Sequence, residues 1–158
     1  MKKLAIIYFS KTGNTEAMAN LIAEGAKAEG GVEVHVDRVE NFSLDRVIDF
    51  DGFVLGSPTY YGAMAGDIKD FLDKTVKFHR KLDGKVGAAF ASAANIGGGN
   101  ETTITGILNA LLIHGMIIQG NPEGDHYGPV SIGAPDDRVS GQCRTLGRRV
   151  ATLLKNLN

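Results

Sequence analysis

The stretch Leu4-Ala5-Ile6-Ile7-Tyr8-Phe9-Ser10-Lys11-Thr12-Gly13-Asn14-Thr15 carries the most information about the fold. Its first six residues form a short apolar run, which is typical of a strand buried on both faces. From Thr15 onward, apolar residues recur at helical intervals until Gly30-Gly31 ends the pattern. The stretch therefore predicts a buried strand, a polar loop and a helix, in that order.

Strand and helix patterns alternate along the rest of the chain, with no linker and no internal repeat. The further predicted strands are 32–37, 53–56, 86–91 and 116–118, the last continuing through 127–132, and the further predicted helices are 68–76, 104–112 and 139–153. Such alternation predicts one α/β domain over residues 1–158, with a parallel sheet covered by helices on both faces. In that architecture ligands bind beyond the carboxyl ends of the strands.

Composition narrows the class of protein. A net charge of −1 excludes a generally basic nucleic-acid binder, so no nucleic-acid partner is expected. The single cysteine, Cys143, excludes an internal disulfide and indicates a reducing, cytoplasmic location. No apolar run approaches the ~20 residues of a membrane span, and Lys11 interrupts the first apolar run too early for a signal peptide.

The loop after the first strand, Ser10-Lys11-Thr12-Gly13-Asn14-Thr15, predicts an anion site. Its backbone N–H groups and the hydroxyls of Ser10, Thr12 and Thr15 can donate to one anion, and the positive end of the following helix favours negative charge there. The loop lacks the Gly-Lys pair of a nucleotide-hydrolysing loop and the glycines of a dinucleotide fingerprint. A polar turn that merely caps the helix is the alternative interpretation.

Two further loops are expected at the same edge of the sheet. Ser57-Pro58-Thr59-Tyr60-Tyr61-Gly62 could present a tyrosine ring to a planar ligand. Ser92-Ala93-Ala94-Asn95-Ile96-Gly97-Gly98-Gly99-Asn100-Glu101 leaves backbone N–H and C=O groups accessible, because its side chains are small. Together the three loops predict a site for a phosphorylated planar heterocycle.

With these loops, the sequence resembles the flavodoxin superfamily, and in particular the WrbA-type FMN-dependent NAD(P)H:quinone oxidoreductases. The resemblance covers nearly the whole chain and is strongest from Gly97-Gly98-Gly99 through Glu101-Thr102-Thr103 to His114-Gly115-Met116. It implies a flavodoxin-like three-layer sandwich with a five-stranded parallel sheet in the order 2-1-3-4-5, and FMN as cofactor. It also implies a catalytic role beside the flavin for His114, and cofactor contacts from Ser10, Lys11, Thr12, Gly13, Asn14, Thr15, Pro58, Thr59, Tyr60, Tyr61, Gly62, Ser92, Ala93, Ala94, Asn95, Gly97 and Gly98.

Some positions depart from the WrbA pattern. Thr12 stands where those proteins carry an aromatic residue, Tyr60 replaces their usual Arg, and the connection 121–126 is shorter. The segment 75–83 is also shorter and lacks their Trp. The resemblance therefore leaves two functions open. One is a reductase that passes electrons from NAD(P)H to a quinone-like acceptor, and the other is a flavodoxin-like carrier that serves a redox partner protein. The near-neutral charge favours the reductase.

The other residues that could take part in chemistry also have purely structural interpretations. His114 could equally be a histidine that ends an apolar helix, and His126 a solvated loop residue. Cys143 lies at core spacing, and no Cys or His pair has metal-ligand spacing, so we expect an inert thiol and no metal. The basic side chains between Lys74 and Lys85 could attract a nucleotide phosphate, although a solvated face is the favoured interpretation. The apolar helix 104–112 is either buried centrally or covered by a second subunit of a homo-oligomer.

Overall fold

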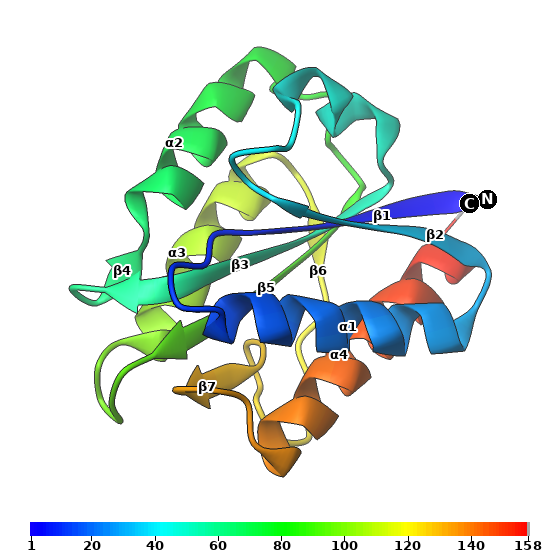
Figure 1. The fold of residues 1–158 in the computed structure, drawn as a ribbon. Coiled ribbons are helices and arrows are strands. Elements are labelled where there is room, and N and C mark those ends of the chain that lie inside the picture. Colours follow the sequence, from blue (N-terminus) through cyan, green and yellow to red (C-terminus); the bar gives the residue numbers. More distant parts are fainter. Residues whose placement is uncertain (158) are drawn as a thin grey trace.

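A parallel sheet forms the middle layer of the computed structural model, which describes residues 1–157 (Figure 1). The strands follow the path β2-β1-β3-β5-β6, which is the predicted order 2-1-3-4-5 for the five parallel positions. Their bounds are β1 (Lys2–Tyr8), β2 (Val32–Arg38), β3 (Gly52–Tyr60), β5 (Val86–Ala93), β6 (Ile117–Ile118) and β7 (Val130–Ile132). A short strand, β4 (Ala63–Met64), pairs antiparallel with the end of β3.

The fifth position of the sheet is shared by two short strands, as the sequence predicted. β6 pairs with Val86 and Gly87 at the start of β5, and β7 pairs with residues 91–93 at its end. The intervening residues 119–129 leave the sheet and return to it. The fifth strand is therefore split into two parts. β6 lies beside the start of β5, at the amino edge of the sheet, and β7 lies beside the end of β5, near the predicted ligand loops.

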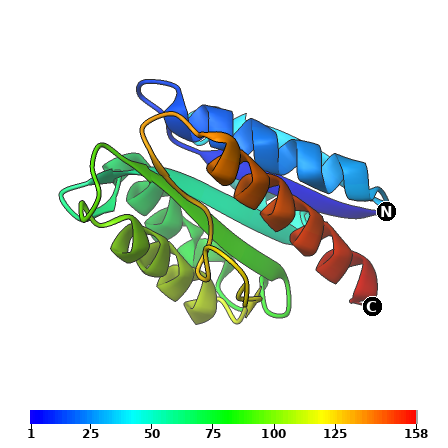
Figure 2. The ribbon, with the colours of Figure 1, turned by 90° about the horizontal axis from the view of Figure 1, so that it is seen from below.

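Two helices cover each face of the sheet. On one face lie α1 (Asn14–Glu29) and α4 (Asp137–Asn156), and on the other lie α2 (Gly66–Lys74) and α3 (Asn100–Ile113). Figure 2, a view from below, shows α1 and α4 side by side. α1 and α4 pack very closely, since a Cβ on Gly147 would lie 1.9 Å from the carbonyl oxygen of Ile22. Two 3₁₀ turns, η1 (Leu44–Asp49) and η2 (Thr75–Phe78), complete the connections.

The core is divided between the two faces of the sheet. One cluster, which includes Phe50, Phe53 and Ile104, fills the space beneath α2 and α3, and the other, which includes Ile6, Met18 and Phe90, lies beneath α1 and α4. Every residue of β5 is buried. Continuous apolar strands without alternation are typical of a sheet covered on both faces, which confirms the three-layer prediction.

Element boundaries differ from the prediction at one functional place. Ser57-Pro58-Thr59 was expected to end the third strand, but β3 continues to Tyr60. The strand persists because β5 pairs with it as far as Pro58, and β4 pairs with its last two residues. The Ser57 hydroxyl also accepts a hydrogen bond from the Ala65 backbone N–H at 2.8 Å. Among residues 1–157, the helices are all too short or too polar to cross a bilayer.

Candidate functional site

Three loops meet at the carboxyl edge of the sheet. The register places Tyr8 beside Gly56, and Pro58 beside Ser92, so β1, β3 and β5 all end at this edge. A hydrogen bond between the hydroxyls of Thr15 and Ser92, at 2.9 Å, joins the first loop directly to the end of β5. The structure thus brings together the three segments that the sequence singled out.

The first loop wraps over the amino end of α1. Gly13 adopts φ +99°, and its N–H donates to the Ser10 hydroxyl oxygen at 3.1 Å. The first helical hydrogen bond runs from Ala17 N–H to Gly13 O, so the N–H groups of Asn14, Thr15 and Glu16 have no partner within the helix. Lys11 and Thr12 are exposed, whereas Ser10 and Thr15 are buried and hold the loop together.

The second loop presents tyrosine rings, as expected, but in two different ways. The Tyr60 ring packs edge-on against Phe9 at a centroid distance of 6.4 Å and stays 41% exposed. Tyr61 has a positive φ of +49° and a fully exposed side chain. A non-glycine residue in this region is uncommon and marks a tight turn, here the turn between β3 and β4. Tyr60 is fixed by packing, and Tyr61 forms a free aromatic flank.

The third loop offers bare backbone on an open surface. Gly97 has φ +75° with no atom within 4 Å of the position that a Cβ would occupy, and Ile96 is 88% exposed. Gly99 lies so close to Gly62 that a Cβ on Gly99 would be 2.7 Å from the Gly62 Cα. The loop also forms one wall of a cavity of about 340 Å³, which β7 and the start of α4 close on the other side. The second and third loops are therefore in close contact at Gly62 and Gly99 and diverge away from that contact.

A buried polar network, which sequence reasoning missed, holds the second and third loops to β7. The Thr59 hydroxyl donates to Asn100 Oδ1 at 3.2 Å, and Asn100 Nδ2 donates to the Ser131 carbonyl at 3.3 Å. The Thr103 hydroxyl donates in turn to the Thr59 oxygen at 3.1 Å. The available sequence signal was Asn100 directly after three glycines, a polar residue at the start of an apolar helix. These residues fix the loops that would flank a planar ligand.

His114 does not lie with the three loops. It follows α3, which starts at the carboxyl edge and runs for 14 residues, about 20 Å, to the opposite edge of the sheet. There its Nε2 is 2.7 Å from the Thr75 hydroxyl, which itself donates to the Leu72 carbonyl at 2.6 Å. The Thr75 oxygen therefore accepts from Nε2–H, and the buried Nδ1 has no hydrogen-bond partner among residues 1–157. Within one chain, α3 therefore carries His114 away from the three loops at which the sequence predicts the flavin.

The ionisation of His114 follows from its surroundings. Burial lowers the pKa of His114, and the neighbouring His79, whose ring centroid is 6.2 Å away, lowers it further. Several of the basic side chains between Lys74 and Lys85, near the same amino edge, have local partners. Lys74 pairs with Asp70 at 2.6 Å, and Lys85 donates to the Ile48 carbonyl at 3.0 Å. This edge of the sheet therefore lies apart from the three loops.

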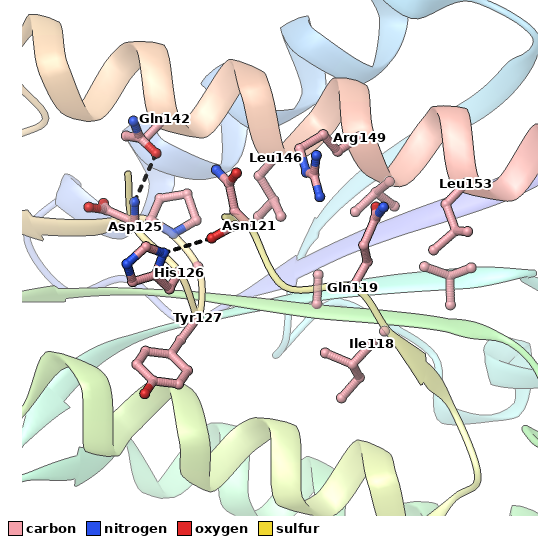
Figure 3. A pocket seen from close by; sticks show the side chains of 16 residues that line it. Ile118, Gln119, Asn121, Asp125, His126, Tyr127, Gln142, Leu146, Arg149 and Leu153 are labelled. Atoms are coloured by element: carbon pink, nitrogen blue, oxygen red, sulfur yellow. Dashed lines mark hydrogen bonds between the residues drawn. The ribbon is translucent and has the colours of Figure 1, made fainter. Parts of the chain in front are cut away.

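A second, smaller pocket lies where the fifth strand is interrupted (Figure 3). The Asp125 backbone N–H donates to Gln142 Oε1 of α4 at 3.2 Å, and His126 Nδ1 lies 2.8 Å from the Asn121 carbonyl oxygen. The cavity measures about 20 Å³, which suits a water molecule but no cofactor. His126 is thus engaged within the excursion and not at the carboxyl edge.

Cys143 lies in the core, as predicted. It is fully buried on α4, and burial, followed by the charge of Asp125, raises the pKa of the Cys143 thiol to about 12. A thiol with so high a pKa is a poor nucleophile, which agrees with the expected inert role. No group of three or more His, Cys, Asp or Glu side chains within the described chain is arranged to hold a metal ion.

The carboxyl-edge site fits a flavin mononucleotide. The free N–H groups at the start of α1 suit a phosphate dianion, and the open backbone at Gly13, Gly62 and Gly97 leaves room where side chains would otherwise project. Tyr60 and Tyr61 provide aromatic surface for a planar ring. This combination of phosphate site, aromatic flank and bare peptide edge defines a flavin-binding protein of the flavodoxin-like class.

Comparison with known proteins agrees with that class. Residues 43–123, which include the second and third loops, match the NADPH-dependent FMN reductase family. A flavodoxin of Clostridium saccharobutylicum is 34% identical over 98% of this chain and 99% of its own length. An NAD(P)H dehydrogenase (quinone) of Archaeoglobus fulgidus is 36% identical over 99% of this chain and 100% of its own. The crystal structure of a flavodoxin, WrbA-like protein from Agrobacterium tumefaciens superposes with a TM-score of 0.83 at 26% identity, over 100% of both chains.

The chain belongs to the NADPH-dependent FMN reductase family within the flavodoxin-like fold. It is a flavodoxin-like protein whose cofactor is FMN. Relatives of similar identity carry the names flavodoxin and NAD(P)H dehydrogenase (quinone). Which of the two functions this chain has must therefore be inferred from the geometry and charge of its own site.

Proposed function

We propose that this chain is an FMN-dependent oxidoreductase that passes electrons from NAD(P)H to a quinone-like acceptor. The observation that carries the proposal is the open rim that the three loops form around the carboxyl-edge site, whose charges sum to zero. The three loops, residues 10–15, 57–62 and 92–101, contain two charged side chains of opposite sign, Lys11 and Glu101. A neutral rim with exposed Tyr61 and Ile96 suits an uncharged planar acceptor. The acidic surface expected of a dedicated flavodoxin carrier is absent from these loops.

The phosphate of FMN would be held by residues Ser10 to Thr15. The N–H groups of Asn14 and Thr15 and the positive end of α1 supply donors and favourable potential without a counter-ion. Lys11 and the Thr12 hydroxyl are exposed at the loop tip and free to turn toward the phosphate. Gly13 supplies the left-handed backbone conformation that lets the loop close over the helix end.

The ring would lie between the second and third loops. Its flanks would be Pro58, Thr59, Tyr60, Tyr61 and Gly62 on one side, and Ser92, Ala93, Ala94, Asn95, Gly97 and Gly98 on the other. Bound FMN would supply the redox chemistry that links oxidation of NAD(P)H to reduction of the acceptor. The protein orients the ring through backbone groups and leaves its outer edge accessible, because Gly97 and Ile96 stand open to solvent.

A carrier role without substrate turnover is the second candidate. It is favoured by the position of His114, because within one chain the three loops then hold no histidine that could exchange protons with a substrate. A single-electron carrier needs no such group. The flavodoxin-like first loop supports the same candidate.

Anaerobic mixing of the FMN-loaded protein with NADH or NADPH, followed by benzoquinone, separates the two functions. The oxidoreductase proposal predicts bleaching of the flavin by at least one nucleotide and multiple turnovers with the quinone. A flavin that dithionite reduces but neither nucleotide does would instead leave the carrier. A protein that does not bind added FMN would contradict both.

A pair of charge variants tests whether the nucleotide approaches at the rim. Ile96→Glu places a negative charge at an 88% exposed position of the third loop, and we expect a higher KM for anionic NADPH. Ile48→Glu adds the same charge to an exposed isoleucine of η1, which lies at the opposite edge of the sheet. That control should leave the KM unchanged. Equal effects of both variants would argue against nucleotide approach at the third loop.

A further inference from the structure

Arg38, the last residue of β2, reaches across to the phosphate loop. The parallel register places it beside Tyr8, the last residue of β1. Its Nη2 donates to the Ser10 backbone carbonyl, and its Nη1 donates to Glu16 Oε2 at 2.8 Å. The guanidinium also lies over the Tyr8 ring, 5.7 Å from its centroid. These contacts fix one side chain against the strand, the loop and the first turn of α1.

The bond to Ser10 sets the direction of a backbone donor. The Ser10–Lys11 peptide is trans, and in a trans peptide the C=O and the following N–H point in opposite directions. By holding the Ser10 carbonyl on the outer side of the loop, Arg38 turns the Lys11 N–H to the other side. The helix start, with the free N–H groups of Asn14 and Thr15, lies in the same short loop.

The bond to Glu16 removes an unfavourable charge. Glu16 is the acidic side chain in the first turn of α1, the turn on which a bound phosphate would sit. A carboxylate near a phosphate dianion repels it, unless a cation lies against the carboxylate. Arg38 is that cation, and Glu40 Oε1 lies 3.5 Å from its other nitrogen. An exposed ion pair alone contributes little to stability. Arg38 differs from an ordinary surface cation because it joins the Ser10 carbonyl of the loop to the Glu16 carboxylate of the helix.

We propose that Arg38 is a positioning residue for the FMN phosphate, acting through the Ser10–Lys11 peptide and through Glu16 without touching the phosphate itself. The inference rests on the proposed binding of the phosphate by the first loop. It adds a residue 22 positions beyond Glu16 in the chain, outside every segment that the sequence analysis assigned to the cofactor.

Comparison of FMN with riboflavin, which lacks the phosphate, tests the inference. Dissociation constants for both are measured on the apo-protein by quenching of flavin fluorescence. For Arg38→Ala we expect about a tenfold or greater rise in the Kd of FMN, and less than about a threefold change for riboflavin. Arg144→Ala is the matched control, because Arg144 pairs with Glu24 at 3.0 Å on the same face of the sheet but away from the loop. It should change neither constant.

The effect of Arg38 through Glu16 can be measured separately from its effect through the Ser10–Lys11 peptide. Adding Glu16→Gln to Arg38→Ala should recover part of the FMN affinity, since the unpaired carboxylate is removed while the Ser10 carbonyl stays free. Arg38→Lys, which replaces the two engaged Nη donors by a single Nζ, should lie between the wild type and Arg38→Ala. It provides the same test should the alanine variant fail to fold.

Two outcomes would overturn the inference. Equal losses for FMN and riboflavin in Arg38→Ala and Arg38→Lys would show a general effect on the fold. Unchanged FMN binding would show that Arg38 is an ordinary surface cation. In both cases the wild type still binds FMN, so the proposed function stands. A wild type that binds no FMN would overturn the proposed function and the inference together.

Discussion

The backbone conformation of the phosphate loop depends on a glycine at position 13. Its φ of +99° is unfavourable for any side chain, although no atom lies within 4 Å of the position that a Cβ would occupy. We expect Gly13→Ala to lower the apo-protein's free energy of unfolding by about 1–3 kcal/mol and to weaken FMN binding, because the strained backbone shifts the loop. Urea unfolding and flavin titration measure the two effects.

Gly84→Ala is the control for Gly13→Ala. Gly84 has φ +76°, also has open space around it, and lies in a turn at the opposite edge of the sheet. It should lose similar stability while keeping its FMN affinity. Equal losses of affinity in the two variants would mean that Gly13 acts only through global stability.

His114 predicts a pH dependence of stability. Burial depresses the pKa of His114 in the folded state below the ordinary value of 6.5, so the unfolded chain binds a proton more readily than the folded one. Stability is therefore unaffected by this group above that pH and falls as the pH drops below it. His114→Leu should flatten the fall of the unfolding free energy between neutral and mildly acidic pH.

His79→Gln serves as the comparison for His114→Leu. His79 is exposed and affects His114 only as the second cause of the depressed pKa. This variant should keep most of the pH dependence. If instead it flattens the profile as strongly as His114→Leu, the charge of His79, and not burial, dominates the effect.

At the scale of elements, the contact between α1 and α4 decides where the phosphate helix lies. A Cβ on Gly147 would meet the Ile22 carbonyl oxygen at 1.9 Å, and one on Gly25 would meet the Arg144 carbonyl oxygen at 2.0 Å. Neither backbone can yield without separating the helices. We expect Gly147→Ala to lower the unfolding free energy by about 3 kcal/mol or more.

The same helix supplies a matched control. Gly141 also lies within α4, but nothing lies within 4 Å of its Cβ position. Gly141→Ala should raise the unfolding free energy by about 0.5–1 kcal/mol, because alanine restricts the unfolded chain and favours the helix. Urea unfolding of both variants checks the pair, and a Gly147→Ala variant as stable as Gly141→Ala would refute the close-contact argument.

At the scale of the whole molecule, the fold and the three loops could be predicted because their signals are local. The apolar run at Leu4 and the alternation after it need only neighbouring residues, and parallel strands bring their loops to one edge. The Thr59–Asn100 bond could not be predicted in this way, because it joins residues 41 positions apart through side-chain geometry. The same holds for Arg38, which reaches Ser10 only through the register of β1 and β2.

The placement of His114 teaches a different lesson. The end of its helix was correctly predicted near residue 112, and within one chain that end lies far from the three loops. A helix that connects two parallel strands must return from the carboxyl edge to the amino edge. Connectivity alone therefore separates the start of α3, at Asn100, from its end at His114. The resemblance implied a role for His114, whereas the direction of α3 determines where His114 lies.

The charge distribution of the whole molecule predicts how the activity responds to salt. The net charge is −1 and the rim carries one charge of each sign, Lys11 and Glu101, so no strong field steers an acceptor toward the flavin. We expect kcat/KM for uncharged benzoquinone to change less than about twofold between about 0.01 M and 0.15 M salt, over which screening lengths fall from about 30 Å to 8 Å.

A protein acceptor provides the contrast. An acidic carrier would reduce a cationic partner such as cytochrome c at a rate that falls steeply with ionic strength, because attraction between opposite charges governs the encounter. For this chain, that rate should be slow and only weakly dependent on salt. Fast, strongly salt-dependent reduction of cytochrome c, together with slow quinone turnover, would favour the carrier, because a neutral rim gives no reason for either.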